Sequence, residues 1–464
     1  ATYTGLNDEG EYVSWQTVSG ATHANSLDLN LIQTDFYAYI TSISEPSEFR
    51  IQYNSWFDNM MRINNENIIK SFYDIDKNFS ETGVRPIENY VVDDGWNLYR
   101  KTAGTMNSKI DIERNGPVSD VNTAGFWQIN NKFGGTLNDS SSLVKKLGSS
   151  FGVWIGPRGG YNYFGTLADI ITEAGNGSKA GGSIDVADTR YVKKFEEFAI
   201  DMMEDYGVSY WKWDGFINRG QFNQFSTGEN VAGYDESHQH MYGGPNGYFH
   251  VTDMWEKWCL LLSNVQDRAD ELGLPNFWIS LTCYVNPSPW YLQFSNSVWM
   301  QCNADRGERY NSGELTDKMN AMLTYRDGVY YDFIKNHQFQ FPLANVYNHD
   351  PIYGKEDTGI TAKSMDGEQF RNYLFMQGTR GTAFWELYYS ASILDTEKYL
   401  VNADFLKWEE ENFHMLRNAK VIGGTPAKSA TLAAGNGLGG GAGAQTGEQN
   451  AYGFACFNNA GDEG

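Results

Sequence analysis

The 464-residue chain is predicted to fold as an α/β protein, a (β/α)8 TIM barrel with small flanking β segments at both ends. Short apolar runs typical of buried strands alternate with segments of helical spacing, and eight such units follow one another from Phe49 onward. Acidic residues follow several of the runs, at the strand ends where a barrel carries its chemistry. The alternative of an open doubly wound sheet lacks its phosphate-binding glycine fingerprint after the first strand.

Three regions are expected along the chain. Residues 1–47 are predicted to form a β-rich N-terminal appendage, because pieces such as Asp35-Phe-Tyr-Ala-Tyr-Ile40 look like strands. Residues 48–420 are predicted to form the catalytic barrel. Residues 421–464 combine a Gly-rich loop with an alternating stretch, 451–457, and predict an incomplete C-terminal β domain.

The barrel strands are expected at regular intervals, each followed or preceded by a helical segment. Asp188 is predicted to cap the helix before the fourth strand, because Phe195, Phe198, Ala199 and Met202 repeat at helical spacing. The eight predicted strands are 49–56, 87–92, 151–157, 210–214, 277–283, 297–302, 341–348 and 382–389.

The fourth predicted strand ends in Tyr210-Trp-Lys-Trp-Asp214-Gly215, and its last carboxylate is a candidate nucleophile. The ammonium of Lys212 favours an ionised carboxylate, and the neighbouring Trp rings are expected to limit water around it. The alternative is an ordinary turn at the Asp-Gly pair.

Three further carboxylates are expected on the same rim. Asp93 and Asp94 follow the second strand, and Asp305 follows the sixth. Carboxylates gathered on one rim suit glycoside hydrolysis, in which one attacks the anomeric carbon and another protonates the leaving oxygen. Turn formation is the alternative at both places. His349, after the seventh strand, is either a substrate contact or a turn residue.

Composition excludes several classes of partner. The net charge of −23 argues against a nucleic-acid groove or an anionic membrane surface, since both require basic patches. No apolar run reaches membrane-spanning length, so no membrane insertion is expected. Aromatic residues make up 15% of the chain, and such rings can stack on sugars. The four cysteines form no CxxC pair, and His238 and His240 have no third ligand nearby, so no metal or cofactor is predicted.

Two motifs together give the sequence a specific resemblance. The stretch Val91-Val-Asp-Asp-Gly-Trp96 and the stretch Tyr210-Trp-Lys-Trp-Asp214 lie about 120 residues apart. The combination resembles glycoside hydrolase family 36 and its relatives in clan D, the α-galactosidases and α-N-acetylgalactosaminidases. The likeness covers roughly 49–420.

The resemblance implies roles for particular residues. It implies that Asp214 is the nucleophile, that Lys212 binds sugar hydroxyls, and that Asp93 and Asp94 bind the 4- and 6-hydroxyls of the sugar. Further sugar contacts are implied for Trp56, Trp154 and Cys283.

The sequence departs from the family pattern in two places. Cys283 is not followed by the usual Ser-Gly-Gly-Gly, which leaves the pocket for the sugar's 2-substituent open. The usual acid/base position holds Cys302, a poor proton donor to a glycosidic oxygen, so the role is assigned to Asp305, three residues later. Gln301 and Arg309 are expected to orient Asp305 or the substrate.

The predicted function is a retaining exo-α-glycosidase that removes terminal α-linked galactose or N-acetylgalactosamine from oligosaccharides or glycoconjugates. A related transglycosylase, similar to raffinose synthase, and a non-catalytic carbohydrate-binding barrel are the alternatives. The chain begins at Ala1-Thr-Tyr-Thr with no targeting segment, and we expect a processed or trimmed piece of a secreted or cell-surface protein.

Overall fold

The structure is a computed structural model of the 464-residue chain. The residues it describes are 9–11, 16–23, 27–157, 159–160, 162–180, 182–215, 247–282, 288–299, 323, 326–328, 330–331, 334, 342–347, 349, 362–424, 431–432, 441–444 and 451–464.

Eight parallel strands form one sheet, in the order β10-β1-β2-β3-β6-β7-β8-β9. The sheet curls toward closure, because the Ala383 N–H next to β10 donates to the Ala344 carbonyl next to β9 at 3.3 Å. The predicted (β/α)8 barrel is therefore confirmed. The strands are β1 (Arg50–Asn54), β2 (Asn89–Val92), β3 (Ser150–Ile155), β6 (Val208–Asp214), β7 (Trp278–Thr282), β8 (Ser297–Trp299), β9 (Val346–Tyr347) and β10 (Phe384–Leu387).

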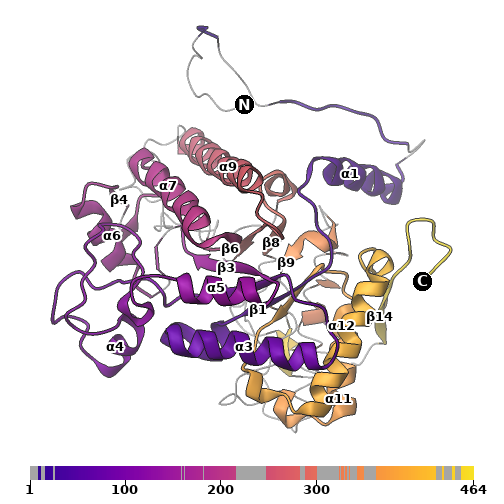
Figure 1. Ribbon diagram of the computed structural model, residues 1–464. Helices are drawn as coiled ribbons and strands as arrows, with labels where there is room; N and C mark the ends of the chain where they lie inside the picture. Colours follow the sequence, from indigo (N-terminus) through magenta and orange to yellow (C-terminus); the bar gives the residue numbers. More distant parts are fainter. Residues whose placement is uncertain are drawn as a thin grey trace.

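Helices surround the strands, as Figure 1 shows. The strands are buried along nearly their whole length, as expected for a parallel sheet covered on both faces. Among the described residues, no helix is long and apolar enough to cross a membrane. The helices that lie between the barrel strands or after them along the chain are α2 (Trp56–Asn59), α3 (Asn65–Glu81), α4 (Lys109–Asn115), α5 (Asn138–Lys146), α6 (Phe164–Glu173), α7 (Thr189–Tyr206), α9 (Gly247–Leu272), α11 (Gly367–Gly378) and α12 (Thr396–Leu416).

Helix α7 leads directly into β6 and confirms the predicted cap. The Asp188 side chain accepts a hydrogen bond from the Arg190 backbone N–H at 2.9 Å. Phe195, Ala199 and Met202 are buried on one face of the helix. Gly207 then ends the helix with a left-handed backbone, and β6 begins at the next residue.

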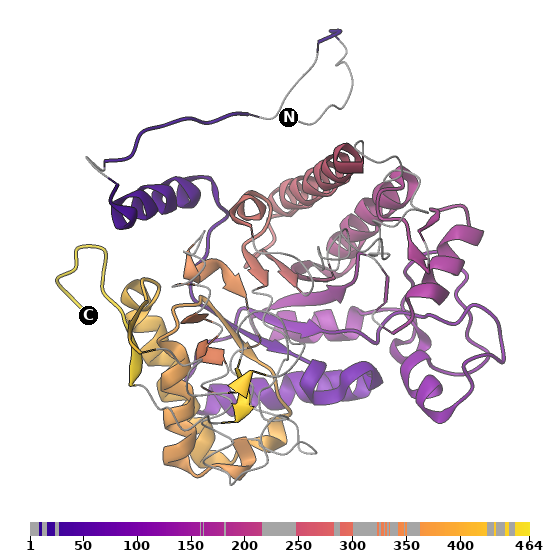
Figure 2. The same ribbon diagram turned by 180° about the vertical axis from the view of Figure 1, so that it is seen from behind.

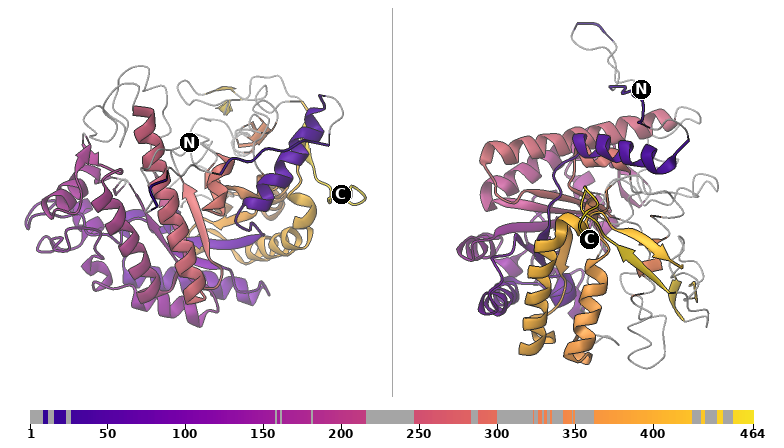
Figure 3. Two further views of the ribbon diagram at one scale, coloured as in Figure 1. Left: turned by 90° about the horizontal axis from the view of Figure 1, so that it is seen from above. Right: turned by 90° about the vertical axis from the view of Figure 1, so that its right-hand side faces the viewer.

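The segment before the barrel contains a helix where the sequence predicted a strand. Helix α1 (Leu29–Ile43) includes the stretch 35–40, and it lies on the outside of the barrel (Figure 3). The prediction overlooked a helical pattern, since Phe36, Tyr39, Ile40 and Ile43 repeat at i, i+3, i+4 and i+7. Ile40 is fully buried in the barrel's core cluster, so α1 packs as an amphipathic helix.

The C-terminal segment contains the strand that the sequence predicted at 451–457. Strand β14 (Tyr452–Ala455) pairs antiparallel with β11 (Lys420–Gly423), and the pair lies beside α12 (Figures 1 and 2). Two other small sheets join β12 (Thr431–Leu432) to β13 (Gly441–Ala444) and β4 (Lys179–Ala180) to β5 (Ser183–Ile184). The boundaries of the three predicted regions stay predictions.

Candidate functional site

Strand β6 divides its side chains between two environments. The Trp213 ring packs against Phe195 of α7 and Trp258 of α9, with ring centroids 5.4 and 6.2 Å apart. Lys212 and Asp214 lie on the other face, toward neighbouring strands. The expectation that the adjacent Trp rings surround Asp214 is therefore wrong for Trp213, whose alternation along the strand turns it toward the helices.

The aromatic partner of Asp214 comes from another strand. Trp154 in β3 is the register partner of Lys212, and its Nε1 donates to Asp214 Oδ2 at 3.0 Å. A hydrogen bond to a carboxylate stabilises its ionised form. Asp214 is only partly buried, at the end of β6. The site thus presents an ionisable carboxylate held by an indole.

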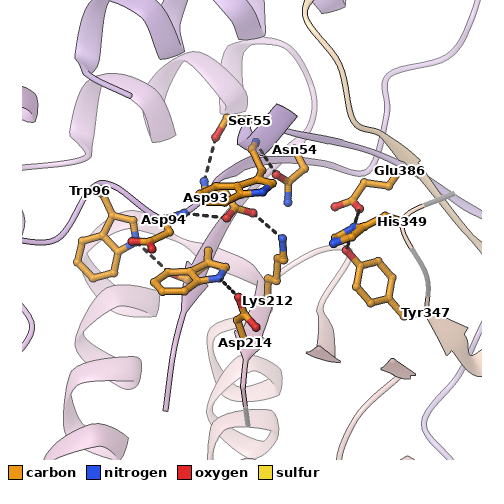
Figure 4. A network of polar contacts seen from close by, with 12 residues as sticks. Asn54, Ser55, Asp93, Asp94, Trp96, Lys212, Asp214, Tyr347, His349 and Glu386 are labelled. Atoms are coloured by element: carbon orange, nitrogen blue, oxygen red, sulfur yellow. Dashed lines mark hydrogen bonds and ion pairs between the residues drawn. The ribbon is translucent and has the colours of Figure 1, made fainter. Parts of the chain in front are cut away.

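Lys212 forms a buried ion pair with the carboxylate that ends β2. Its Nζ lies 2.8 Å from Asp93 Oδ2, and the two side chains are only 3% and 2% exposed. Burial disfavours the ammonium, but the charges of Asp93, Glu386 and Asp214 outweigh burial and raise the pKa of Lys212. Lys212 therefore stays a cation among carboxylates (Figure 4).

A tight turn after β2 places Asp93 and Asp94 side by side. The Asp93 N–H donates to Ser55 Oγ at 3.0 Å, and the Asp94 N–H donates to Asp93 Oδ1 at 2.8 Å. Gly95 has φ +126°, and a Cβ there would lie 2.6 Å from the Met61 carbonyl oxygen. The turn requires glycine, which explains the Asp-Asp-Gly order physically.

Asp94 is a buried carboxyl group with one oxygen left for a ligand. The Tyr99 hydroxyl donates to Oδ1 at 3.0 Å, while Oδ2 is buried without a hydrogen-bond partner in the part of the chain that the structure describes. Burial raises the pKa of Asp94 to about 7, with the charges of Asp93 and Asp214 adding to the effect. A buried oxygen of this kind is an acceptor for a hydroxyl donor.

Trp56 begins α2, two residues after Asn54, the last residue of β1. Its backbone N–H donates to Asn54 Oδ1 at 2.9 Å, and its side chain is partly buried. The preceding Ser55 is the residue that contacts Asp93, so Trp56 lies next to the Asp pair along the rim. The structure thus gathers Asp93, Asp94, Trp154, Lys212 and Asp214, with Trp56 at the adjoining strand end.

Four other predicted site residues lie outside the described residues, and so do both histidines of the 238–240 stretch. Their proposed roles stay predictions. Among the described residues, no group of His, Cys, Asp and Glu is arranged to hold a metal ion. The four site residues are Cys283, Gln301, Asp305 and Arg309.

The sequence interpretation missed a polar cluster at the ends of β9 and β10. Glu386 is fully buried, and its Oε2 accepts from the Tyr347 hydroxyl at 2.7 Å and lies 2.9 Å from His349 Nδ1. A glutamate inside the otherwise apolar run Ala383-Phe-Trp-Glu-Leu387 was the available signal, because charged residues are rarely fully buried without a partner. Tyr99, the partner of Asp94, lies in a long loop and gave no such signal.

The chain is similar to known proteins in its fold but not in its sequence. No protein-family model matches the chain, and no curated protein matches it. An α-galactosidase of glycoside hydrolase family 36 from Geobacillus stearothermophilus matches in structure with a TM-score of 0.52 and 14% identity, over 85% of this chain and 47% of that one. The α-galactosidase from Lactobacillus brevis matches with a TM-score of 0.52 and 12% identity, over 86% of this chain and 46% of that one.

Each structural match covers most of this chain and less than half of the neighbour. The chain spans about half the length of the solved structures that it matches. This chain therefore has the fold of the α-galactosidase barrels of glycoside hydrolase family 36.

Proposed function

We propose that the chain is a clan D glycoside hydrolase, a retaining exo-α-glycosidase that removes terminal α-linked galactose-configured sugars. One observation carries the proposal: Asp214, held by the Trp154 indole, lies at the end of β6 on the same rim as the Lys212–Asp93 ion pair. The rim thus combines a candidate nucleophile with groups that can bind hydroxyls. Either galactose or N-acetylgalactosamine fits the proposal.

The neighbours support the same class of substrate. Variants of the Geobacillus enzyme were solved in complex with 1-deoxygalactonojirimycin, a galactose-configured ligand, and with the oligosaccharide raffinose. Both ligands are bound to the Geobacillus enzyme in those structures. Since this chain spans about half their length, its own activity is a proposal that rests on its rim residues.

The proposed reaction is a double displacement. The Asp214 carboxylate attacks the anomeric carbon, the bond to the aglycone oxygen breaks, and Asp305 gives its proton to that oxygen. Asp305 then removes a proton from water, which attacks the glycosyl ester and releases Asp214. Two inversions retain the α configuration. This route predicts roughly 5 to 6 Å between the carboxyl groups of Asp214 and Asp305, whereas about 9 Å would favour inversion.

The remaining rim residues are proposed to hold the sugar. Lys212, Asp93 and Asp94 would bind hydroxyls, and the buried Asp94 Oδ2 is suited to accept from one of them. The ring of Trp56 would flank the sugar, and Trp154 would keep Asp214 oriented. Contacts from Cys283, Gln301 and Arg309 complete the proposed site.

The test is hydrolysis of nitrophenyl α-galactoside and nitrophenyl α-N-acetylgalactosaminide, with the first product anomer followed by NMR. We expect turnover of at least one of the two, with the α anomer formed first. The Asp214→Asn variant should lose activity by roughly 10³-fold or more, because the amide cannot attack. The exposed Asp201→Asn variant serves as the matched control.

Two results would overturn the proposal. A β anomer as the first product would exclude retention. A folded Asp214→Asn variant with the activity of the unmodified protein would exclude Asp214 as nucleophile.

A further inference from the structure

Glu386 occupies the inner face of the barrel beside the proposed sugar site, yet the proposed reaction assigns it no role. In β10 it is the register partner of Gln52 in β1, and it is fully buried. Figure 4 shows Lys212 and Glu386 on neighbouring sides of the same polar cluster, and the charge of Glu386 raises the pKa of Lys212. A carboxylate that is buried this deeply requires a compensating partner.

Two side chains fix the orientation of Glu386. The Tyr347 hydroxyl, His349 Nδ1 and Glu386 Oε2 lie 2.7 to 2.9 Å from one another, which forms a closed triangle of polar atoms. The His349 ring stacks on Tyr388, with centroids 4.4 Å apart, and is 4.6 Å from the Trp299 ring. The carboxylate therefore has little freedom to turn away from the barrel interior.

Lys212 lies between two carboxylates that come from different strands. Asp93 contacts its ammonium directly at 2.8 Å, and Figure 4 shows Glu386 and His349 on the other side of Lys212 from Asp93. The Tyr388 ring is a third neighbour, with its centroid 5.4 Å from Nζ. The ammonium is thus attracted in two directions.

A second anion matters for the availability of Lys212 to a substrate. A buried ammonium with one carboxylate partner is stabilised most by moving fully onto that partner. The attraction of Glu386 on the other side offsets part of this pull, so that the ammonium, which contacts Asp93, can still donate to a sugar hydroxyl. We propose that Glu386 is a positioning residue for Lys212, and that Tyr347 and His349 hold Glu386 in the orientation that this requires.

The positioning effect depends on the charge of Glu386. Burial raises its pKa to about 7, although the Lys212 ammonium, the Tyr347 hydroxyl and the amides of Asn54 and Gln52 all lower it. His349 and Tyr210 are the other titratable groups that face it. The carboxylate is ionised above about pH 7 and neutral below it, so its hold on Lys212 is present at high pH and lost as the pH falls.

The kinetic test rests on the proposed function and compares Glu386→Gln with the unmodified protein from pH 5 to pH 9. Above pH 8, we expect kcat/KM of the variant to be lower by roughly 10- to 100-fold, since small displacements of a positioning group have effects of this size. Near pH 5 the two proteins should agree within about twofold, because Glu386 is then neutral in both.

Two further variants sharpen this test. Tyr347→Phe removes a donor that lowers the pKa of Glu386. We therefore compare kcat/KM of Tyr347→Phe with that of the double variant Tyr347→Phe/Glu386→Gln. The pH midpoint of this ratio should be higher than the midpoint measured without the Tyr347→Phe change. Glu368→Gln, at an exposed position in α11, is the matched control and should leave kcat/KM unchanged. A ratio that is the same at pH 5 and pH 9 would show a merely structural role for Glu386 and overturn the proposal.

A thermal measurement tests the coupling of Glu386 to Lys212 without any substrate. Glu386 has a raised folded-state pKa, so its contribution to stability is present below its ordinary value of 4.5 and is lost as the pH rises through about 7. The Tm of Glu386→Gln relative to the unmodified protein should therefore rise over this interval. In a Lys212→Met background the rise should extend to higher pH, because the cation that lowers the pKa of Glu386 is gone.

The thermal cycle separates failure of this inference from failure of the proposed function. If the Tm difference caused by Glu386→Gln depends on pH in the same way with Lys212 and in the Lys212→Met background, Glu386 and Lys212 are not coupled. This result would overturn the inference. If the rise in the Tm difference extends to higher pH in the Lys212→Met background, but the protein hydrolyses neither nitrophenyl glycoside, the positioning of Lys212 is supported and the proposed glycosidase is contradicted.

Discussion

At the scale of single residues, the unusual environment of Asp94 leads to a measurable dependence on pH. Its pKa is raised to about 7 by burial and by the nearby charges of Asp93 and Asp214. Because the pKa of Asp94 is raised in the folded protein, the group stabilises the fold at pH values below its ordinary pKa of 3.8. This contribution is lost as the pH rises through about 7. We expect the Tm of Asp94→Asn, relative to the unmodified protein, to increase between pH 4 and pH 8.

The control for this measurement is Asp139→Asn in the exposed first turn of α5. Its Tm difference should lack the increase between pH 4 and pH 8. A difference for Asp94→Asn that stays flat across the same range would contradict the assigned environment of Asp94.

The sequence predicted the positions of some site residues better than their surroundings. Asp93, Asp94, Lys212 and Asp214 were predicted from their positions at strand ends, and the barrel brings them together. The geometry depends on pairing between strands that are distant in the sequence, such as the register of β3 with β6 that brings Trp154 to Asp214. Neighbours along the chain do not reveal such contacts.

Glu386 illustrates the same limit. The apolar run around Glu386 predicted that it is buried, but its partners are Tyr347, in a different strand, and His349, two residues further along the chain. The sequence left His349 open between a substrate contact and a turn residue. The structure shows that His349 contacts Glu386, which neither alternative foresaw.

At the scale of elements, helix α1 joins the N-terminal segment to the barrel. Ile40 is fully buried, while Leu31 in the same helix is 45% exposed. We expect Ile40→Ala to lower the free energy of unfolding by about 2 to 4 kcal/mol, because a buried side chain is replaced by a cavity. Chemical denaturation measures the change.

Leu31→Ala is the matched control, and its effect should stay within about 0.5 kcal/mol. If both variants unfold like the unmodified protein, α1 is not packed on the barrel in solution.

The elements show why strands of the barrel were easier to predict than α1. Barrel strands are short apolar runs between polar turns, so β2, β3, β6 and β7 lie within two residues of their predicted ends. The stretch 35–40 in α1 has aromatic residues on both sides of a single alanine, and over so few residues alternation and helical spacing look alike. Only the longer pattern to Ile43 distinguishes them.

At the scale of the whole molecule, the C-terminal strand is tied to the barrel through a buried charge network. The Tyr452 hydroxyl in β14 donates to Asp327 Oδ2 at 2.8 Å, and Arg380 Nε donates to Asp327 Oδ1 at 2.7 Å. We expect Tyr452→Phe to lower the free energy of unfolding by about 1 to 3 kcal/mol, because a hydrogen bond to a buried carboxylate is lost.

The matched control is Tyr73→Phe on the exposed surface of α3, which should change stability by less than about 0.5 kcal/mol. Equal stability of the Tyr452→Phe variant and the unmodified protein would show that the hydrogen bond from Tyr452 to Asp327 adds nothing to stability.

The eight described parallel strands form one nearly closed barrel with candidate catalytic groups on its rim, and the central claim is that Asp214 is the nucleophile. The most direct measurement is mass spectrometry of peptides after incubation with 5-fluoro-α-galactosyl fluoride, which forms a glycosyl ester that hydrolyses slowly. The account predicts one sugar label, attached to Asp214 in the peptide that contains 208–215. A label on another carboxylate, such as Asp93 or Asp94, would contradict it.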